Sequence, residues 1–454
     1  MIGVVRLAEV AEFISAKHRG ANVPFQFVST DTRTLQPGDL YVALIGDRLD
    51  GHQYIEQAIE KGACAVVVSK AVDVSVPTLL VKDTTEALGL LALFNRNKFQ
   101  RDVVAITGSS GKTTVKGMMA TLLRQQNEVL VTRGNFNNHI GAPITLLRLN
   151  DTYDYAVVEL GASAEGEIAY TSNLAKPTVS ILTNAEASHL EGFGDIQTIV
   201  RTKGEIIDAL PKDGAAILNA DSPYFSQWRE RAGTKQVFSF GINEEADVRG
   251  ENLETDVLGC CGFTLKIANE EASVQLRVMG RHNVMNALSC AAACHALKMP
   301  IAQIVTGLES FEGVEGRLVE KKGLNGSVVI DDTYNANPAS VRAAVDVLGS
   351  RAGHKIFVMG DMAELGVETQ LAHAESGVYA RHGQIDEFFA LGEFSRGAAD
   401  SFGDNAHWFA SHENLVRFLK TKLKPDTAVL VKGSRSAHMD RVVSEIIEHS
   451  DKNN

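Results

Sequence analysis

One short stretch, residues 102–126, constrains the fold of this 454-residue chain more than any other. An apolar run predicts a strand over residues 102–107, a glycine-containing loop follows, and a helical pattern continues to about Gln126. Glycines let backbone N–H groups converge on phosphate oxygens, and the N-terminus of the following helix adds positive potential. The stretch therefore predicts a phosphate-binding loop, in which Lys112 supplies a point charge and the Thr113 hydroxyl a ligand for Mg²⁺. The loop consists of Gly108, Ser109, Ser110, Gly111, Lys112, Thr113 and Thr114.

The spacing of this loop is shorter than the common GxxxxGK[ST] pattern. Ile106 stands where that pattern has its first glycine, which here comes two residues later, at Gly108. A glycine-rich turn without a ligand is the alternative interpretation. Because a strand and a helix flank the loop in the required order, we favour phosphate binding.

The rest of the chain alternates between short β-rich runs and amphipathic segments, which is typical of parallel sheets with crossover helices. The clearest strands are residues 102–107, 155–160, 178–183, 327–331, 355–360, 387–391 and 427–431. Before residue 100 the alternation is looser, with strands at 40–45 and 64–69 around a helix at 54–61. The pattern predicts an α/β fold.

Two breaks divide this pattern into three domains, as the length also favours. The polar stretch 95–101 predicts one linker, and the glycine-rich residues 313–316 precede a fresh series of strands and helices. We expect a small α/β N-terminal domain (1–100), a central parallel-sheet ATPase domain with the phosphate loop (101–315) and a C-terminal Rossmann-like α/β domain (316–454).

Charge and cysteine content exclude several classes of protein. The net charge of -12 opposes non-specific attraction to nucleic acid or to an anionic membrane, and the sequence has no apolar run of bilayer length. The five cysteines form neither a disulfide framework nor a CxxC motif, so we expect a reducing cytosol. Cys290 and Cys294 are four residues apart on a predicted helix, and core packing is favoured over metal binding.

Three residues are candidates for metal chemistry beside the loop. Glu159 ends the second strand, at the sheet edge where parallel sheets place their ligands, although a solvated strand-end acid is the alternative. His189 follows another strand, where a lone histidine is more often a surface residue than a ligand. The pattern alone reads Lys203 as an exposed lysine on a helix. A lysine that is partly desolvated beside the site could instead lose its proton and react with CO₂ to form a carbamate, although the sequence pattern alone does not lead to that assignment.

At this point the motifs resemble those of the Mur ligases, the ATP-dependent amino-acid or peptide ligases of bacterial peptidoglycan synthesis, along the whole chain. The motifs that occur in the family's order are residues 107–114 (TGSSGKTT), 135–141 (NFNNHIG), 159–161 (ELG), Asn184 with His189, 203–205 (KGE) and 281–286 (RHNVMN). Residues 331–338 (DDTYNANP) and 359–366 (MGDMAELG) are similar to the branch of the family that adds a dipeptide.

The resemblance implies roles for residues of the nucleotide site. Lys112 and the loop amides would hold the β- and γ-phosphates of ATP, Thr113, Glu159 and His189 would organise Mg²⁺, and Lys203 would be carbamylated and support the metal. The catalytic set would be Lys112, Glu159, His189 and Lys203. Asn283 and Asn286 would contact adenine, although Asn283 could instead cap its helix. Arg317 and Asp332 would reach the phosphates and ribose after domain closure, with a surface salt bridge as the alternative for each.

The resemblance also implies two substrate sites. Residues similar to the family's UDP-sugar region are Ser29, Thr32, Arg33, Asp50 and His52. Asn137 and Asn138 would lie near the UDP-linked substrate or the γ-phosphate, and an Asn-rich turn explains them nearly as well.

The dipeptide would meet a second group of residues. Asp361 and Glu364 would face its ammonium, with helix capping as the alternative for Asp361. Tyr334, Asn335 and Asn337 would fill the same cleft or form the turn before Pro338. Arg435, in the basic segment 432–435, would bind the dipeptide carboxylate or belong to a solvated loop.

The implied reaction uses ATP and Mg²⁺ to join D-alanyl-D-alanine to UDP-N-acetylmuramoyl-tripeptide through an acyl phosphate, releasing ADP and phosphate. We expect a cytoplasmic monomer that serves cell-wall synthesis, cell shape and cell division and that has no nucleic-acid partner and no membrane insertion. Two alternatives stay open: a folylpolyglutamate synthase, which would leave the first 100 residues unexplained, and a nucleotide-dependent switch.

Overall fold

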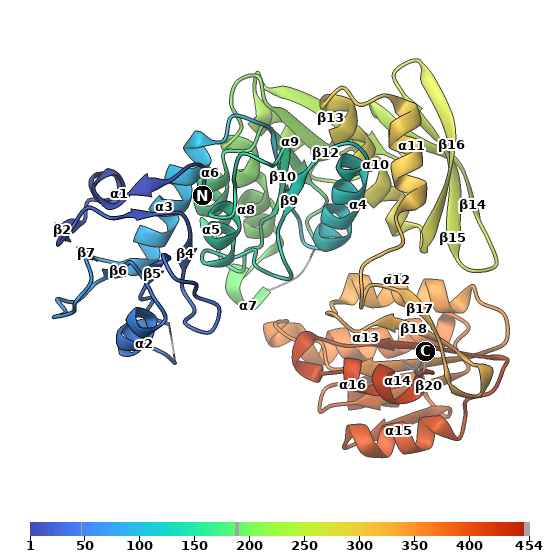
Figure 1. Cartoon of the computed structure of the whole chain (residues 1–454). Helices are drawn as coiled ribbons and strands as arrows, with labels where there is room; N and C mark the ends of the chain where they lie inside the picture. The colour runs from blue at the N-terminus through green and yellow to red at the C-terminus, as the bar shows by residue number, and fades with distance from the viewer. Residues whose placement is uncertain (47, 187–189, 449–454) are drawn as a thin grey trace, which may run out of the picture.

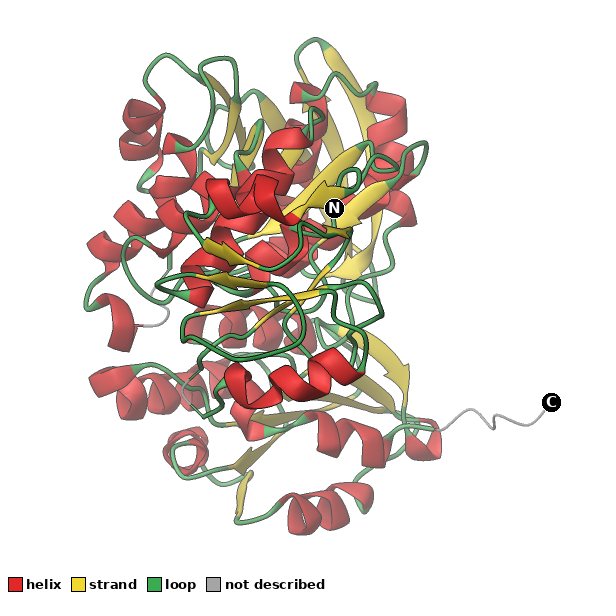
Figure 2. Ribbon diagram, turned by 60° about the vertical axis from the view of Figure 1, so that its left-hand side comes forward, coloured by secondary structure: helices red, strands yellow, loops and turns green. Residues whose placement is uncertain are grey.

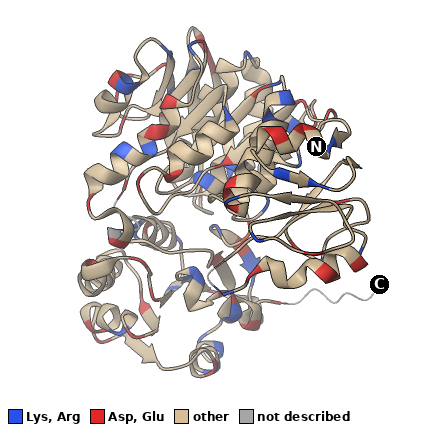
Figure 3. Cartoon of the chain, turned by 90° about the vertical axis from the view of Figure 1, so that its left-hand side faces the viewer, with Lys and Arg blue, Asp and Glu red and all other residues tan. Residues whose placement is uncertain are grey.

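The computed structural model describes residues 1–46, 48–186 and 190–448, which form three bodies in chain order (Figure 1). The first is blue in that view, the second runs from teal to yellow, and the third is orange to red. Figure 2 shows the C-terminal helices and strands below the other two bodies. Lys and Arg are interspersed with Asp and Glu over all three bodies (Figure 3).

The N-terminal body is a small α/β unit. Its main sheet has the order β2-β7-β6-β5-β4, in which β4 to β7 pair in parallel and β2 is antiparallel to β7, and β1 pairs with β3 separately. Its elements are β1 (Val5–Arg6), α1 (Leu7–Phe13), β2 (Lys17–Arg19), β3 (Pro24–Phe25), β4 (Val28–Ser29), β5 (Leu40–Val42), η1 (Gly51–Tyr54), α2 (Ile55–Glu60), β6 (Ala65–Val68), β7 (Thr78–Leu80) and α3 (Thr84–Lys98).

The central body is built on one sheet of order β16-β15-β14-β13-β12-β11-β8-β10-β9. Neighbouring strands pair in parallel throughout the part of this order that consists of β14, β13, β12, β11, β8, β10 and β9. The elements are β8 (Val103–Thr107), α4 (Lys112–Arg124), β9 (Val129–Val131), α5 (Gly141–Leu146), β10 (Tyr155–Glu159), α6 (Glu167–Ala175), β11 (Val179–Leu182), α7 (Leu190–Phe193), α8 (Ile196–Asp208), β12 (Ala215–Asn219), α9 (Phe225–Ala232), β13 (Gln236–Gly241), β14 (Val248–Thr255), β15 (Cys260–Ile267), β16 (Glu270–Met279), α10 (His282–Ala296) and α11 (Ile301–Ser310).

The parallel strands are continuous apolar runs in the sequence because their side chains alternate between two buried faces of the sheet. In β8, Val103 and Ala105 pack into the core on one face of the sheet, with α5, α6 and α8, whereas Val104 and Ile106 pack into the core on the other face, with α4, α10 and α11. A strand that is buried on both faces needs apolar residues at every position. Cys290 and Cys294 of α10 are buried in the second of these cores, as their interpretation as core thiols predicts.

The C-terminal body repeats the doubly covered design on a second sheet of order β17-β18-β22-β19-β20-β21, parallel except for β17. Its elements are β17 (Val319–Lys322), η2 (Leu324–Gly326), β18 (Val328–Asp332), α12 (Pro338–Gly349), β19 (His354–Gly360), η3 (Gly366–Glu368), α13 (Thr369–His382), β20 (Glu387–Leu391), α14 (Ser395–Phe402), β21 (Ala406–Phe409), α15 (His412–Lys420), β22 (Thr427–Lys432), η4 (Arg435–Ala437) and α16 (Asp440–Ile446). The predicted three-domain α/β fold is confirmed, and each predicted strand is present with small shifts at its ends.

Two features differ from the prediction. The central sheet was expected to be parallel, but β15 and β16 extend it beyond β14 with antiparallel pairing. Residues 95–98, predicted to belong to a linker, form the last turn of α3. Asn95 is fully buried, and its amide nitrogen donates to the carbonyl oxygens of Leu146 and Leu149. Arg96 donates to the carbonyl oxygens of Ala175 and Lys176.

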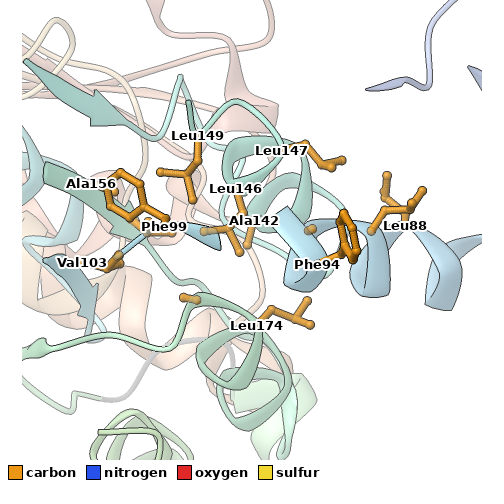
Figure 4. Packing of buried hydrophobic residues seen from close by; sticks show 14 of the residues in the cluster. Leu88, Phe94, Phe99, Val103, Ala142, Leu146, Leu147, Leu149, Ala156 and Leu174 are labelled. Carbon is orange, nitrogen blue, oxygen red and sulfur yellow. The ribbon is translucent and has the colours of Figure 1, made fainter. Parts of the chain in front are cut away.

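Helix α3 therefore attaches the N-terminal body firmly to the central body. Figure 4 shows Leu88 and Phe94 of α3 in one apolar cluster with Leu146 of α5 and Leu174 of α6. The polar contacts of its last turn lie beside this cluster, so the junction combines apolar packing with satisfied buried hydrogen bonds. In the described residues, every helix is too short or too polar to cross a membrane.

Candidate functional site

The phosphate loop lies between the end of β8 and the start of α4, as predicted. Two of its residues have to be glycine. Gly108 has φ +151° and a Cβ there would lie 1.9 Å from Thr183 Oγ1, while Gly111 has φ +80° and a Cβ there would lie 2.6 Å from Asn286 Oδ1. The sequence of the loop is therefore fixed by its backbone and by its close neighbours.

Lys112, the first residue of α4, reaches back over the loop. Its Nζ donates to the carbonyl oxygens of Gly108 at 2.6 Å and Ser109 at 3.1 Å. Burial lowers the pKa of Lys112, and the charge of Glu159 opposes that shift. Ser110 is held from the neighbouring strand end, because its N–H donates to Asn184 Oδ1 and its hydroxyl to Glu186.

Glu159 ends β10 beside the loop and is only 2% exposed. The Thr113 hydroxyl lies 3.2 Å from both carboxylate oxygens, Asn137 Nδ2 donates to Oε1 at 2.8 Å, and Lys116 Nζ lies 2.9 Å from Oε2. Burial acts to raise the pKa of Glu159, but the charges of Lys116 and Lys112 outweigh it and lower that pKa. The alternative of a solvated strand-end acid is excluded, because the side chain is buried and held by three neighbouring side chains.

The sequence reasoning missed Lys116. A signal was available, since Lys116 follows Lys112 by four residues and Thr113 by three on the predicted helix, and such spacings share one helix face. A face that carries two functional side chains is the place to look for a third.

Mg²⁺ fits this set of donors. Hard carboxylate and hydroxyl oxygens suit the ion, which is commonly held by one or two carboxylates together with substrate phosphates. Glu159 and Thr113 provide such oxygens next to the loop. Among the described residues, no three His, Cys, Asp or Glu side chains gather as a self-sufficient metal site. His189, the third predicted ligand, lies outside the described residues.

Lys203 is buried within α8 and is 1% exposed, against the reading of an exposed lysine. Burial and the charge of Lys112 lower its pKa to about 7. Its Nζ lies 3.4 Å from the carbonyl oxygen of Ala162, which lines the site, and 5.3 Å from the centre of the Phe193 ring. A large fraction of this amine is therefore neutral and nucleophilic at neutral pH.

The first turn of α10 contributes the two asparagines predicted to contact adenine. Asn283 donates to the carbonyl oxygen of Met279, and Asn286 donates to Asn283 Oδ1. The N-cap position of α10 is Arg281, so Asn283 is not the cap. Asn286 lies against the phosphate loop at Gly111, which places this pair beside the nucleotide loop.

The C-terminal body supplies the opposite wall. Arg317 lies over the Tyr334 ring, 4.2 Å from its centre, and Arg435 lies 5.9 Å from the same centre. Asp332 at the end of β18 pairs with Lys432 at the end of β22, with 2.6 Å between Oδ2 and Nζ. This pair is buried, so Asp332 is not part of a surface salt bridge. Burial raises the pKa of Asp332 and lowers that of Lys432, while each charge favours the ionised form of the other.

Loop 333–337 continues this wall. Lys432 Nζ also donates to the carbonyl oxygen of Asn335 at 2.9 Å. Asn337 is the N-cap of α12, in a capping box with Ser340, and its amide nitrogen lies 3.5 Å from Ser110 Oγ of the phosphate loop. Asn337 therefore forms the turn before Pro338 and at the same time touches the central body.

All these elements surround one cavity of about 790 Å³. Its lining includes most of the predicted nucleotide and dipeptide residues: Ser109, Ser110, Gly111, Lys112, Thr113, Thr114, Asn137, Asn138, Glu159, Asn283, Asn286, Arg317, Asp332, Tyr334, Asn335, Asn337, Glu364 and Arg435. The chain can therefore present phosphate-binding groups and a buried carboxylate to one ligand-sized space that two bodies enclose.

Asp361 does not belong to this lining. Its carboxylate accepts hydrogen bonds from the N–H and the hydroxyl of Ser395 at the start of α14, at 2.7 Å and 2.6 Å. Asp361 is not itself a helix N-cap, since that position of α14 is Phe394, but its contacts tie its segment to the first residue of α14. Glu364, three residues further on, lines the cavity with a positive φ of 62°.

The predicted UDP-sugar residues of the N-terminal body are also absent from the described lining of this cavity. Asp50 accepts from the N–H and the ring Nδ1 of His52 and pairs with Lys70, contacts that lower its pKa. His52 Nε2 in turn accepts from the Ser69 N–H. The remaining predicted residues form local contacts, since Ser29 and Arg33 bond to Asp31 and Thr32 bonds to Gln57.

Comparison with known proteins identifies the family. Models of three domains match in order: "Mur ligase family, catalytic domain" over residues 24–96, "Mur ligase middle domain" over 106–294, and "Mur ligase, glutamate ligase domain" over 316–435. The UDP-N-acetylmuramoyl-tripeptide--D-alanyl-D-alanine ligase of Escherichia coli (strain K12) is 41% identical over 448 residues, which are 98% of this chain and 99% of that relative.

Solved structures agree with the sequence match. The crystal structure of MurF from Acinetobacter baumannii has a TM-score of 0.93 and 34% identity, covering 98% of this chain and 99% of that one. MurF ligase from Thermotoga maritima in complex with ADP has a TM-score of 0.83 and 27% identity, covering 92% and 96%. On the evidence of the site, the domain matches and the near-complete relatives, the chain belongs to the Mur ligase family.

Proposed function

We propose that this chain joins D-alanyl-D-alanine to UDP-N-acetylmuramoyl-tripeptide at the expense of ATP. One observation carries the proposal: the phosphate loop, the buried Glu159 and the C-terminal residues Arg317, Asp332 and Tyr334 line the same cavity. The named function of relatives that match nearly the whole chain supports it, as does the ADP complex of the Thermotoga maritima ligase.

Forming an amide from a carboxylate requires activation, because a carboxylate is a poor electrophile. In the proposed reaction the tripeptide carboxylate attacks the γ-phosphorus of ATP, which gives an acyl phosphate and ADP. Lys112 and the loop amides neutralise the charge that develops on the phosphoryl oxygens. The dipeptide amine then attacks the acyl carbon, and inorganic phosphate leaves.

Glu159 and Thr113 would hold Mg²⁺ in this reaction. The ion supplies charge neutralisation on the β- and γ-phosphates when bound. The protein itself brings the reactants together in the cavity and excludes water from the acyl phosphate. Arg317 and Asp332 lie on the C-terminal side of the site. We propose that these two residues contact the phosphates and the ribose of the nucleotide.

Lys203 is proposed to carry CO₂ as a carbamate. Its Nζ would form a bond to the carbon of CO₂ and release a proton, which converts a buried amine into an additional carboxylate near the metal. The lowered pKa of Lys203, about 7, and its burial support this reaction, because it needs a neutral amine.

We propose that Tyr334, Asn335, Asn337, Glu364 and Arg435 meet the dipeptide, since all five line the cavity on its C-terminal side. Asp361 would contribute by anchoring the loop that carries Glu364.

The UDP group would bind at the N-terminal residues Ser29, Thr32, Arg33, Asp50 and His52, with Asn137 and Asn138 at the acyl end. We further propose domain boundaries near residues 100 and 315 and a monomeric enzyme located in the cytoplasm.

The test is a phosphate-release assay with purified protein, ATP and Mg²⁺, from which each substrate is omitted in turn. Rapid release is expected only when UDP-N-acetylmuramoyl-tripeptide and D-alanyl-D-alanine are both present, together with a pentapeptide product of matching mass. A nucleotide switch would release phosphate without an acceptor, and a folylpolyglutamate synthase would require a folate and glutamate. Either of those outcomes contradicts the proposal.

A further inference from the structure

We infer that Lys116 is a positioning residue for the nucleotide site, which fixes the Glu159 carboxylate from behind. The inference deepens the proposed function and rests on it, since it concerns the carboxylate assigned to the metal–nucleotide complex. It adds a residue outside the loop motif and outside the predicted catalytic set.

Lys116 lies in α4, one turn beyond Lys112, and its side chain is 8% exposed. Among the described residues, its Nζ contacts Glu159 Oε2 at 2.9 Å and the carbonyl oxygen of Gly134 at 3.0 Å. Lys116 is not among the described residues that line the 790 Å³ cavity. It lines a separate groove of about 550 Å³ beside α4, together with residues 310–315. The groove adjoins the cavity, since Thr113, Gly134 and Tyr334 line both, so Lys116 lies behind the site and contacts it through the residues that it holds.

The two partners of Lys116 belong to two walls of the site. Asn137 holds one oxygen of Glu159 and Lys116 holds the other, so rotation of the carboxylate is resisted at both oxygens. Gly134 lies in the loop after β9 that carries Asn137, and the same loop is tied to the end of β10 by the Gly161 N–H, which donates to the Asn137 carbonyl oxygen at 2.8 Å. Lys116 thus connects the strand end to the loop that orients it.

Lys116 supplies the positive charge that contacts Glu159 directly, whereas the Lys112 ammonium is held by the carbonyl oxygens of Gly108 and Ser109. The Glu159 carboxylate is 2% exposed, and a buried carboxylate needs a contacting counter-charge to stay in place. The Thr113 hydroxyl and the Asn137 amide are neutral and cannot provide one. A side chain of similar length without charge would fill the space but would release the carboxylate.

The experiment measures binding of Mn²⁺ with ADP by electron paramagnetic resonance of the free ion, using the full chain. Lys116→Met is compared in the wild-type and Glu159→Gln backgrounds, and Lys116→Arg tests rescue by a retained charge. Arg124→Met is the matched control, because Arg124 lies on α4 and lines the same groove but donates to the Val129 carbonyl oxygen.

Lys116→Met is expected to weaken Mn²⁺·ADP binding by about tenfold, or about 1.4 kcal/mol, in the wild-type background. In the Glu159→Gln background the same change should alter binding by less than about twofold, because interacting residues are non-additive. Lys116→Arg should recover most of the loss, and Arg124→Met should bind like the wild type.

An equal loss in both backgrounds, or no loss in the wild-type background, overturns the inference. If Lys116→Met alone does not fold, the double variant removes both charges and leaves no orphaned carboxylate. It is then compared with Glu159→Gln alone: equal binding supports the inference, and a further large loss overturns it. Failure of the proposed function is seen separately, as wild-type protein that binds Mn²⁺·ADP but forms no pentapeptide.

Discussion

Replacing Lys203 by methionine should stabilise the unliganded protein while abolishing its activity. The pKa of Lys203 is about 7, compared with an ordinary value of 10.5, and one pKa unit corresponds to about 1.4 kcal/mol. Keeping this lysine buried therefore costs the folded state up to about 5 kcal/mol at pH 7 and below. Methionine has a similar length and carries no charge to desolvate.

The pH dependence of this effect has a definite sign. Between pH 7 and 10.5 the unfolded chain keeps a proton on Lys203 that the folded chain has lost, so stability rises with pH in this window. The advantage of Lys203→Met should thus be full at pH 6 to 7 and should shrink as the pH approaches 10.

The assay is urea unfolding followed by tryptophan fluorescence in CO₂-free buffers at pH 6.5 and 9.5. Trp228 is a suitable reporter, because it is buried and its Nε1 donates to the Val200 carbonyl oxygen of α8, the helix that carries Lys203. Lys212→Met, at an exposed lysine, is the control. Destabilisation of Lys203→Met at pH 6.5, or a gain that is equal at both pH values, would refute the reasoning.

Three further substitutions test other parts of the structure. Gly111→Ala should reduce ADP affinity more than about 100-fold, because residue 111 has a left-handed φ of +80° that alanine rarely adopts and the added Cβ would lie 2.6 Å from Asn286 Oδ1; a titration showing wild-type affinity would contradict this. Lys432→Met should cost about 3–5 kcal/mol by leaving Asp332 buried without its partner, and thermal unfolding should show most of that stability restored by adding Asp332→Asn. Asn95→Leu should cost about 2–3 kcal/mol by removing three hydrogen bonds, those to the Leu146 and Leu149 carbonyl oxygens and the partly buried one from the Ile2 N–H; an unchanged melting temperature in thermal unfolding would count against the proposed role of α3.

Local pattern was sufficient to predict much of the fold. The parallel strands are buried on both faces, so their apolar runs stand out, and the phosphate loop is recognisable from residue types alone. Strands β14 to β16 were missed because they alternate buried and exposed residues and carry many polar side chains, a much weaker signal.

Burial of charged residues was harder to predict, since it depends on partners that other strands supply. The pattern indicates that Lys432 is part of a basic segment after the last strand, and only the fold shows that β18 places Asp332 beside it. No role was predicted for Lys116, which only the fold places against Glu159. Lys203 is different. It falls within the apolar stripe Ile199, Val200, Ile206 and Ile207 of α8, so helical periodicity offered a signal of its burial, which the prediction of an exposed lysine overlooked.

The N-terminal substrate residues show the limit of motif reasoning. Asp50 and His52 form a local network with Ser69 and Lys70, and the sequence could not reveal which groups these residues bind within the fold. The assignment of the UDP-sugar site thus rests on the resemblance, with the geometry giving the local contacts.

The most direct test of the central claim follows oxygen from substrate to product. UDP-N-acetylmuramoyl-tripeptide labelled with ¹⁸O in its terminal carboxylate is incubated with the protein, ATP, Mg²⁺ and D-alanyl-D-alanine, and the released phosphate is analysed by mass spectrometry. Activation through an acyl phosphate predicts one ¹⁸O atom in each phosphate formed. Pentapeptide formation with unlabelled phosphate would contradict the account.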